Sequence, residues 1–235
     1  MITLNSDAAS TSLSKTTKAI LNEYGIKLNK NLGQNYLIDR NKRDQIIQFG
    51  NLTKDDVVLE IGPGIGTLTI ELAKRVKKVI AIEQDSNICQ ILENRLKKEN
   101  IDNVELINDD ALNVEFPKFD KIISNLPYQI SSPITFKFLN YDFQLAILMY
   151  QKEFASRMNG KVGSKDYSRL SAMLYFKCDV DLLTGVSAES FIPKPKVDST
   201  VVRLTPKLPE LNGQLKHLNI NEINEKDFKT YSKFV

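Results

Sequence analysis

The stretch Asn125-Leu126-Pro127-Tyr128 combines residue types that can hold the exocyclic amine of a flat base. The Asn125 side-chain oxygen and the Leu126 carbonyl can accept the two hydrogens of such an amine. Pro127 fixes a turn, and the Tyr128 ring can stack on the face of the base. The motif therefore predicts a site that modifies a nucleobase. Because Asn-x-Pro also marks an ordinary turn after a strand, the rest of the chain has to support this interpretation.

A second stretch, Glu60-Ile-Gly-Pro-Gly-Ile-Gly66, joins a predicted buried strand to an amphipathic segment. Glycines between a strand and a helix let the backbone approach a ligand and present N–H groups to it. Their positions, Gly62, Gly64 and Gly66, miss the Gly-x-Gly-x-x-Gly spacing of dinucleotide-binding turns. This spacing disfavours a dinucleotide oxidoreductase and favours another nucleoside cofactor.

Two carboxylates follow the next predicted strands. Glu83 is the last residue of a strand roughly 20 residues after the glycine turn. In proteins of this architecture, an acid at this position binds a ribose diol. Asp110, after the third strand, can accept a hydrogen bond from the amine of a cofactor adenine, although a helix cap or a solvated loop acid is an equal alternative. With the glycine turn and Asn125, these acids end four successive strands. Together they predict a pocket for S-adenosylmethionine.

The elements that must position these residues alternate along the chain. Apolar periodicity predicts strands at 56–61, 78–83, 104–108, 121–124, 144–150, 180–186 and 197–204. It predicts helices at 14–24, 40–49, 67–76, 86–98, 133–139, 151–158 and 168–178. Strands separated by helices form parallel βαβ units. We therefore expect an α/β fold with a doubly wound, seven-stranded, Rossmann-like sheet that ends in a β-hairpin edge.

The composition narrows the class of protein. The chain of 235 residues carries 32 Lys and Arg against 29 Asp and Glu, and this net charge of +3 does not by itself require nucleic acid. Cys89 and Cys178 lie far apart and form no Cys/His cluster, so we expect no metal site and a reduced, cytoplasmic setting. No apolar run approaches the ~20 residues of a transmembrane helix, so we expect no membrane association.

Basic residues gather after the fifth predicted strand and around Phe191. They are usually solvated, but beside a base pocket they can contact RNA phosphates. The group comprises Lys152, Arg157, Lys161, Lys165, Arg169, Lys194 and Lys196. We expect three regions: a tail and short helix at 1–27, a catalytic domain at 28–206, and a linker with a helix stub at 207–235. The only histidine, His217, lies in the last region and receives no catalytic role.

Five motifs in order resemble the KsgA-type adenosine dimethyltransferases of small-subunit ribosomal RNA. The likeness covers residues 28–206 and rests on Leu32-Gly-Gln-Asn-Tyr-Leu37, Glu60-Ile-Gly-Pro-Gly-Ile-Gly66, Asp110-Ala-Leu112, Asn125-Leu-Pro-Tyr-Gln-Ile-Ser-Ser-Pro133 and Phe191-Ile-Pro-Lys-Pro-Lys-Val-Asp-Ser199. The resemblance implies transfer of methyl groups from S-adenosylmethionine to N6 of two adjacent adenosines near the 3′ end of that RNA. It also implies cofactor contacts from Asn35, Leu37, Gly62, Glu83, Asp110 and Asn125.

Two departures from the family pattern stand out. Tyr36 occupies a position where the family usually has Phe, a mild change if the hydroxyl reaches a partner. The family continues into a basic helical C-terminal domain, whereas this sequence stops at Val235, inside what would be its first helix. We expect cofactor binding to survive this difference, and docking on the ribosome to be affected.

Phe191 is a candidate for the second face of the base, with an ordinary core residue as the equal alternative. The resemblance implies small-subunit ribosomal RNA, within a pre-ribosomal particle, as the partner of a monomeric enzyme. Other enzyme hypotheses are a related adenine N6-methyltransferase acting on large-subunit ribosomal RNA and a DNA adenine methyltransferase. A different class of hypothesis is a non-catalytic ribosome-assembly or RNA-binding factor that keeps the pocket.

Overall fold

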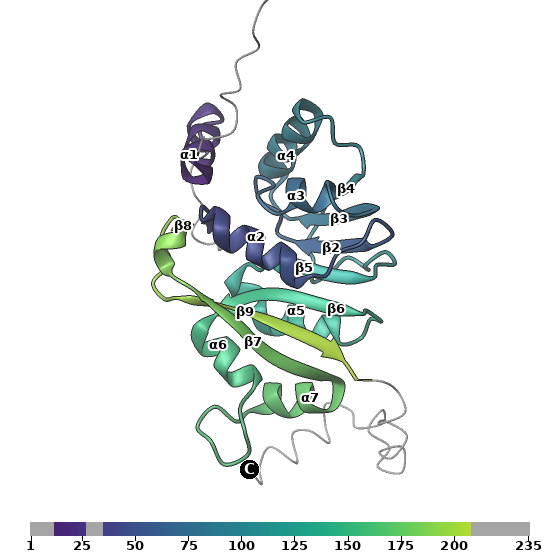
Figure 1. The fold of residues 1–235 in the computed structure, drawn as a ribbon, viewed down its shortest axis with the longest axis vertical. Coiled ribbons are helices and arrows are strands. Elements are labelled where there is room, and N and C mark those ends of the chain that lie inside the picture. Colours follow the sequence, from purple (N-terminus) through teal and green to yellow (C-terminus); the bar gives the residue numbers. More distant parts are fainter. Residues whose placement is uncertain (1–11, 27–34, 208–235) are drawn as a thin grey trace, which may run out of the picture.

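The computed structural model describes residues 12–26 and 35–207 (Figure 1). The tail predicted before residue 12, the Leu32-Gly33-Gln34 part of the first motif, and the linker and helix stub with His217 lie outside the described residues. In the described part, no helix is long and apolar enough to cross a membrane.

A seven-stranded sheet forms the centre of the molecule, in the order β4-β3-β2-β5-β6-β9-β7. Its strands are β2 Val57–Ile61, β3 Lys78–Glu83, β4 Val104–Asn108, β5 Lys121–Asn125, β6 Leu145–Gln151, β7 Cys178–Val186 and β9 Ser199–Pro206. β2 to β6 pair in parallel, and β9 runs antiparallel between β6 and β7. The predicted doubly wound α/β fold with an antiparallel edge is confirmed.

Helices cover both faces of this sheet (Figure 1). They are α1 Leu13–Glu23, α2 Arg40–Phe49, α3 Thr69–Ala73, α4 Ser86–Lys98, α5 Ser131–Phe138, α6 Lys152–Met158 and α7 Arg169–Lys177. Because parallel strands are buried on both sides, neighbouring residues enter different cores. Val58 packs in a cluster with residues of α2 and α3, whereas Leu59 packs in a cluster with residues of α5, α6 and α7.

Two predicted helices differ from the observed ones by two or more residues at one end or both, whereas the others agree within one residue at each end. The amphipathic pattern at 67–76 yields a helix only at Thr69–Ala73, although the flanking Leu68 and Lys74 also have right-handed helical backbone angles. The helix predicted to begin at Pro133 begins two residues earlier, at Ser131, directly after a 3-10 turn at Tyr128–Ile130. Pro133 lies in the first turn, where its missing N–H is not needed.

A small two-stranded sheet joins distant parts of the chain. β1, Tyr36–Leu37, pairs antiparallel with β8, Phe191–Ile192. The sequence does not predict this pair, since two residues are too few to show a period of two. The pairing places the first motif of the family beside the last.

Candidate active site

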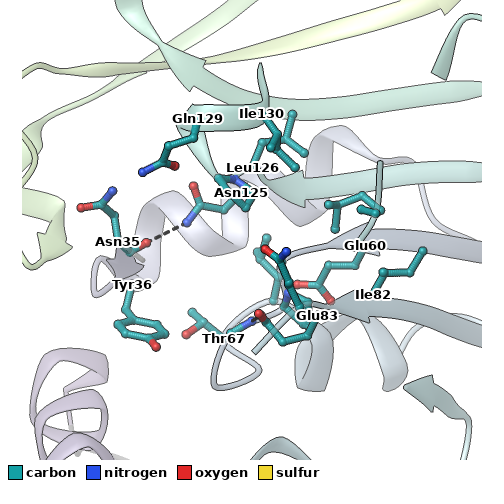
Figure 2. Close-up of a pocket in the computed structure, with 18 of the residues that line it drawn as sticks. Asn35, Tyr36, Glu60, Thr67, Ile82, Glu83, Asn125, Leu126, Gln129 and Ile130 are labelled. Carbon is teal, nitrogen blue, oxygen red and sulfur yellow. Dashed lines mark hydrogen bonds between the residues drawn. The ribbon is translucent and has the colours of Figure 1, made fainter. Parts of the chain in front are cut away.

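A cavity of about 310 Å³ opens at the carboxyl ends of β2, β3 and β5 (Figure 2). Doubly wound sheets bind ligands at this edge. All six residues that the resemblance assigns to the cofactor line it, namely Asn35, Leu37, Gly62, Glu83, Asp110 and Asn125. The fold thus brings together side chains that are up to 90 residues apart, as Asn35 and Asn125 are.

The glycine turn touches the Asn-Leu-Pro-Tyr turn. Gly62 has a φ of +68°, which favours glycine, and a Cβ at this position would lie 3.0 Å from Pro127 Cγ. The close approach needs both the left-handed backbone and the missing side chain. Glycine at this position therefore lets the β2 turn and the β5 turn form one continuous wall of the cavity.

Glu83 is held by backbone donors at the end of β3. Its Oε2 accepts from Gly64 N at 3.1 Å, and its Oε1 accepts from Asp85 N at 3.0 Å. Burial raises the pKa of Glu83, while these backbone hydrogen bonds oppose the rise. The carboxylate has a fixed orientation at the cavity wall, where it can accept hydrogen bonds from a ribose diol.

Asp110 both caps its own turn and lines the cavity. Its Oδ1 accepts from Leu112 N at 2.9 Å, and its Oδ2 accepts from Asn113 Nδ2 at 3.3 Å. No helix follows Asp110, so it caps a turn and not a helix, and these two contacts fix the carboxylate without removing it from the cavity wall.

The amide of Asn125 is oriented by the backbone of the first motif. Its Nδ2 donates to the carbonyl of Asn35 at 3.0 Å, the contact drawn in Figure 2. This contact turns the side-chain oxygen away from Asn35 and leaves it to accept a hydrogen from a ligand. The neighbouring Leu126 is 2% exposed, and Pro127 closes the turn. Asn125, Leu126 and Pro127 all line the cavity.

Tyr128 and Phe191 have different environments. Tyr128 is half-buried directly after the cavity-lining Pro127, and its hydroxyl oxygen lies 2.5 Å from Ser199 Oγ. Phe191 is only 2% exposed and packs in the core cluster that contains Leu37 and Met149. Of the two alternatives for Phe191, a ring against the base or an ordinary core residue, this structure has the core arrangement, because β8 pairs with β1 and the ring packs in the core.

Two cavity residues to which the sequence assigns no role each carry a buried oxygen atom without a hydrogen-bond partner among the described residues. Neither Glu60 Oε2 nor the Tyr36 hydroxyl has a hydrogen-bond partner among the described residues, and both residues line the cavity. Burial raises the pKa of both, that of Glu60 to about 8. The signal for Glu60 was present in the sequence, since it is the one charged residue inside the strand Val57–Ile61.

The charge of the cavity suits a cationic ligand. Four acids line it, Glu60, Glu83, Asp109 and Asp110, and none of its described lining residues is Lys, Arg or His. Among residues 12–26 and 35–207 no group of three or more His, Cys, Asp or Glu is placed to hold a metal ion. S-adenosylmethionine, a nucleoside with a sulfonium and an ammonium group, fits this lining. The fold and the site define the chain as a methyltransferase that depends on S-adenosylmethionine.

Comparisons with known proteins identify the family. The ribosomal RNA adenine dimethylase family matches residues 25–228. The "Probable ribosomal RNA small subunit methyltransferase A" of Methanosphaera stadtmanae is 54% identical over 191 residues, which cover 81% of this chain and 70% of that protein. The chain belongs to the ribosomal RNA adenine dimethylase family, and the resemblance of its motifs is confirmed.

Two solved structures support this assignment. A dimethyladenosine transferase from Plasmodium falciparum has a TM-score of 0.70 and 43% identity, and the match covers 73% of this chain and 63% of that one. The 23S ribosomal RNA methyltransferase ErmE has a TM-score of 0.66 and 33% identity, over 73% of this chain and 70% of that one. The first is the more similar of the two.

Proposed function

We propose that this chain dimethylates N6 of two adjacent adenosines near the 3′ end of small-subunit ribosomal RNA. The observation that carries the proposal is the Asn125 amide, which the Asn35 carbonyl orients at the edge of an acid-lined cavity. Family membership supports it, as do the names of relatives at about half identity, which are small-subunit methyltransferases.

The residues that line the cavity would position the cofactor. Glu83 would hold the ribose of the cofactor, Asp110 its adenine amine, and the turn at Gly62 its amino-acid part. S-adenosylmethionine, when bound, supplies an activated methyl group, so the protein needs no metal and no covalent nucleophile. The protein has to orient the accepting amine and exclude competing water.

The Asn-Leu-Pro-Tyr turn prepares the target amine. Asn125 Oδ1 and the Leu126 carbonyl accept the two N6 hydrogens, which draws the nitrogen lone pair out of conjugation with the ring. Tyr128 stacks on the adenine, with its hydroxyl held by Ser199. Because the base must leave its stack to reach this turn, the substrate is single-stranded or flipped out.

The basic residues near the site provide an RNA surface. The side chains of Lys152, Arg157, Lys161, Lys165 and Arg169 are exposed on α6, on α7 and between them. α6 directly follows β6, the neighbour of the strand that carries Asn125. We infer that these residues contact phosphates of small-subunit RNA in a pre-ribosomal particle, and that the protein acts there as a cytoplasmic monomer.

Methylation of the large subunit is the second candidate, because ErmE is 33% identical and shares the fold. Immature small subunits, large subunits and duplex DNA should be incubated in parallel with methyl-labelled cofactor. We expect label only in the small subunit, as N6,N6-dimethyladenosine by mass spectrometry. Label confined to large subunits or DNA would contradict the proposal, and cofactor binding without any transfer would favour the non-catalytic assembly factor.

A further inference from the structure

The connection between β4 and β5 carries Asp110 but contains no helix. Residues 109–120 join these two strands, whereas the other connections between successive parallel strands contain α3, α4 or α5. A helix satisfies most of its own carbonyl groups through internal hydrogen bonds. A loop in the same place has to find other donors for its carbonyls where they are shielded from water.

Lys137, from α5, supplies such donors. Its ammonium group donates to the carbonyl oxygens of Ala111 at 2.9 Å and Leu112 at 3.2 Å, and also to that of Val114. These contacts can use all three N–H groups of an ammonium. The Lys137 Nζ also lies 4.3 Å from the centroid of the Phe116 ring. One side chain thus fixes the course of the loop directly after Asp110.

The loop that Lys137 holds in turn holds Asp110. The Asp110 Oδ1 accepts from the N–H of Leu112, whose carbonyl accepts from Lys137. The Asp110 carbonyl accepts from the N–H groups of Asn113 at 2.9 Å and Val114 at 3.0 Å. A shift of the loop away from Lys137 would therefore move the Asp110 carboxylate at the cavity wall.

Lys137 also belongs to the segment that continues from the Asn-Leu-Pro-Tyr turn. α5 begins directly after the 3-10 turn Tyr128–Ile130. Ile134 and Phe138 of α5 pack in the same core cluster as Ala111. The helix that follows the base-holding turn is therefore joined to the Asp110 loop by apolar packing and by the Lys137 ammonium group.

We propose that Lys137 is a positioning residue, which holds the Asp110 carboxylate where it accepts a hydrogen bond from the amine of the cofactor adenine. This inference rests on the proposed function. Lys137 is not among the described residues that line the cavity, so it acts through the loop and not on the ligand. A carboxylate held in this place attracts the adenine amine and disfavours a base with a carbonyl oxygen there. Lys137 therefore contributes to the preference for an adenine nucleoside.

The preference is measured by titration calorimetry with two ligands. S-adenosylhomocysteine carries the adenine amine, and S-inosylhomocysteine carries a carbonyl oxygen in its place. We expect the unmodified protein to bind the first about tenfold more tightly or better, the value of one hydrogen bond to a charged group. In Lys137→Met, which keeps the length of the side chain but has no donor, this preference should fall by about threefold or more.

Lys121→Met is the matched control. Lys121 donates to the Asn51 carbonyl at 2.7 Å and to Asp56 at 2.9 Å, and it begins β5, at the end of the strand opposite the cavity. Its replacement should lower stability in urea and leave the preference unchanged. Lys137→Gln, with two N–H donors on a shorter side chain, should show an intermediate preference. It provides the test if Lys137→Met does not fold.

An unchanged preference in Lys137→Met, or in Lys137→Gln where the first variant does not fold, would overturn the inference. An equal fall in Lys121→Met would do the same, because it would trace the effect to lost stability. Equal affinity of the unmodified protein for the two ligands would show that Asp110 does not bind the amine, and would also overturn it. In these cases S-adenosylhomocysteine still binds, so the proposed function stands. Failure of the unmodified protein to bind either ligand would instead contradict the proposed function.

Discussion

The hydroxyl oxygen of Tyr128 lies 2.5 Å from Ser199 Oγ, which ties the base-holding turn to the first residue of β9. Ser199 is 1% exposed, and the contact fixes the position of the Tyr128 hydroxyl at the far end of the ring. We expect Ser199→Ala to reduce kcat about tenfold, the value of one lost hydrogen bond, with the affinity for S-adenosylmethionine unchanged.

Tyr128→Phe is the matched control, because it removes the same contact and keeps the ring. The two single variants and the double variant should lose similar activity in single-turnover assays. Additive losses would show that the residues act separately and would refute the positioning role of Ser199.

Replacement of Asn125 should separate chemistry from cofactor binding. Asn125→Ala removes the acceptor for the target amine and the donor to the Asn35 carbonyl. We expect methyl transfer to fall by roughly 100-fold or more, with cofactor affinity weakened but measurable by calorimetry. Full activity in this variant would contradict the assigned role.

The burial of Glu60 predicts that the free energy of unfolding depends on pH. Burial raises its pKa from 4.5 to about 8, so between these values the folded state binds more protons than the unfolded state. The free energy of unfolding should therefore fall as pH rises through this range, by roughly 4 kcal/mol from this group. Urea unfolding of the cofactor-free protein at several pH values measures the effect.

Glu60→Gln is the control for this dependence, since Glu83 contributes in the same direction in both proteins. The variant should unfold at higher urea than the parent above neutral pH and should show a flatter pH profile. Identical profiles for the two proteins would mean that Glu60 is ionised in the folded state.

A comparison of two glycines tests how tightly the cofactor turn is packed. Gly66 has a φ of +88°, and a Cβ there would lie 2.5 Å from Cδ1 of the fully buried Leu92. Gly163 has a φ of +82°, with no atom within 4 Å of such a Cβ. Gly163→Ala should cost about 1 kcal/mol of backbone strain, and Gly66→Ala about 2–4 kcal/mol, by urea unfolding. Equal costs would show that Leu92 moves aside freely.

The sequence was sufficient to predict the strands of the sheet and the functional residues at their carboxyl ends. The change between strand and helix periodicity located β2 to β6, and an acid or amide at the end of a parallel strand necessarily reaches the same edge. This logic predicted that Glu83, Asp110 and Asn125 would lie together, and they line one cavity.

The other features of the fold and the site depend on contacts that leave no periodic signal in the sequence. The pairing of β1 with β8 involves two residues on each side, and it decides that the Phe191 ring lies in the core. Glu60 stands out as the one charged residue inside the strand Val57–Ile61, but that it is only 2% exposed depends on how the folded chain packs around it. The orientation of the Asn125 amide likewise depends on a carbonyl 90 residues away.

The β1–β8 pair also bears on when the site can form during synthesis. The Asn35 carbonyl that orients Asn125 directly precedes β1, and β1 gains its strand partner only when residues 191–192 have been made. Tyr128 gains the hydrogen-bond partner of its hydroxyl later still, when Ser199 has been made. A nascent chain that ends before these residues holds the nucleoside-binding strands but lacks the contacts that aim the amide and the ring. The base-holding turn is therefore completed last, which keeps an unfinished chain from presenting a finished site.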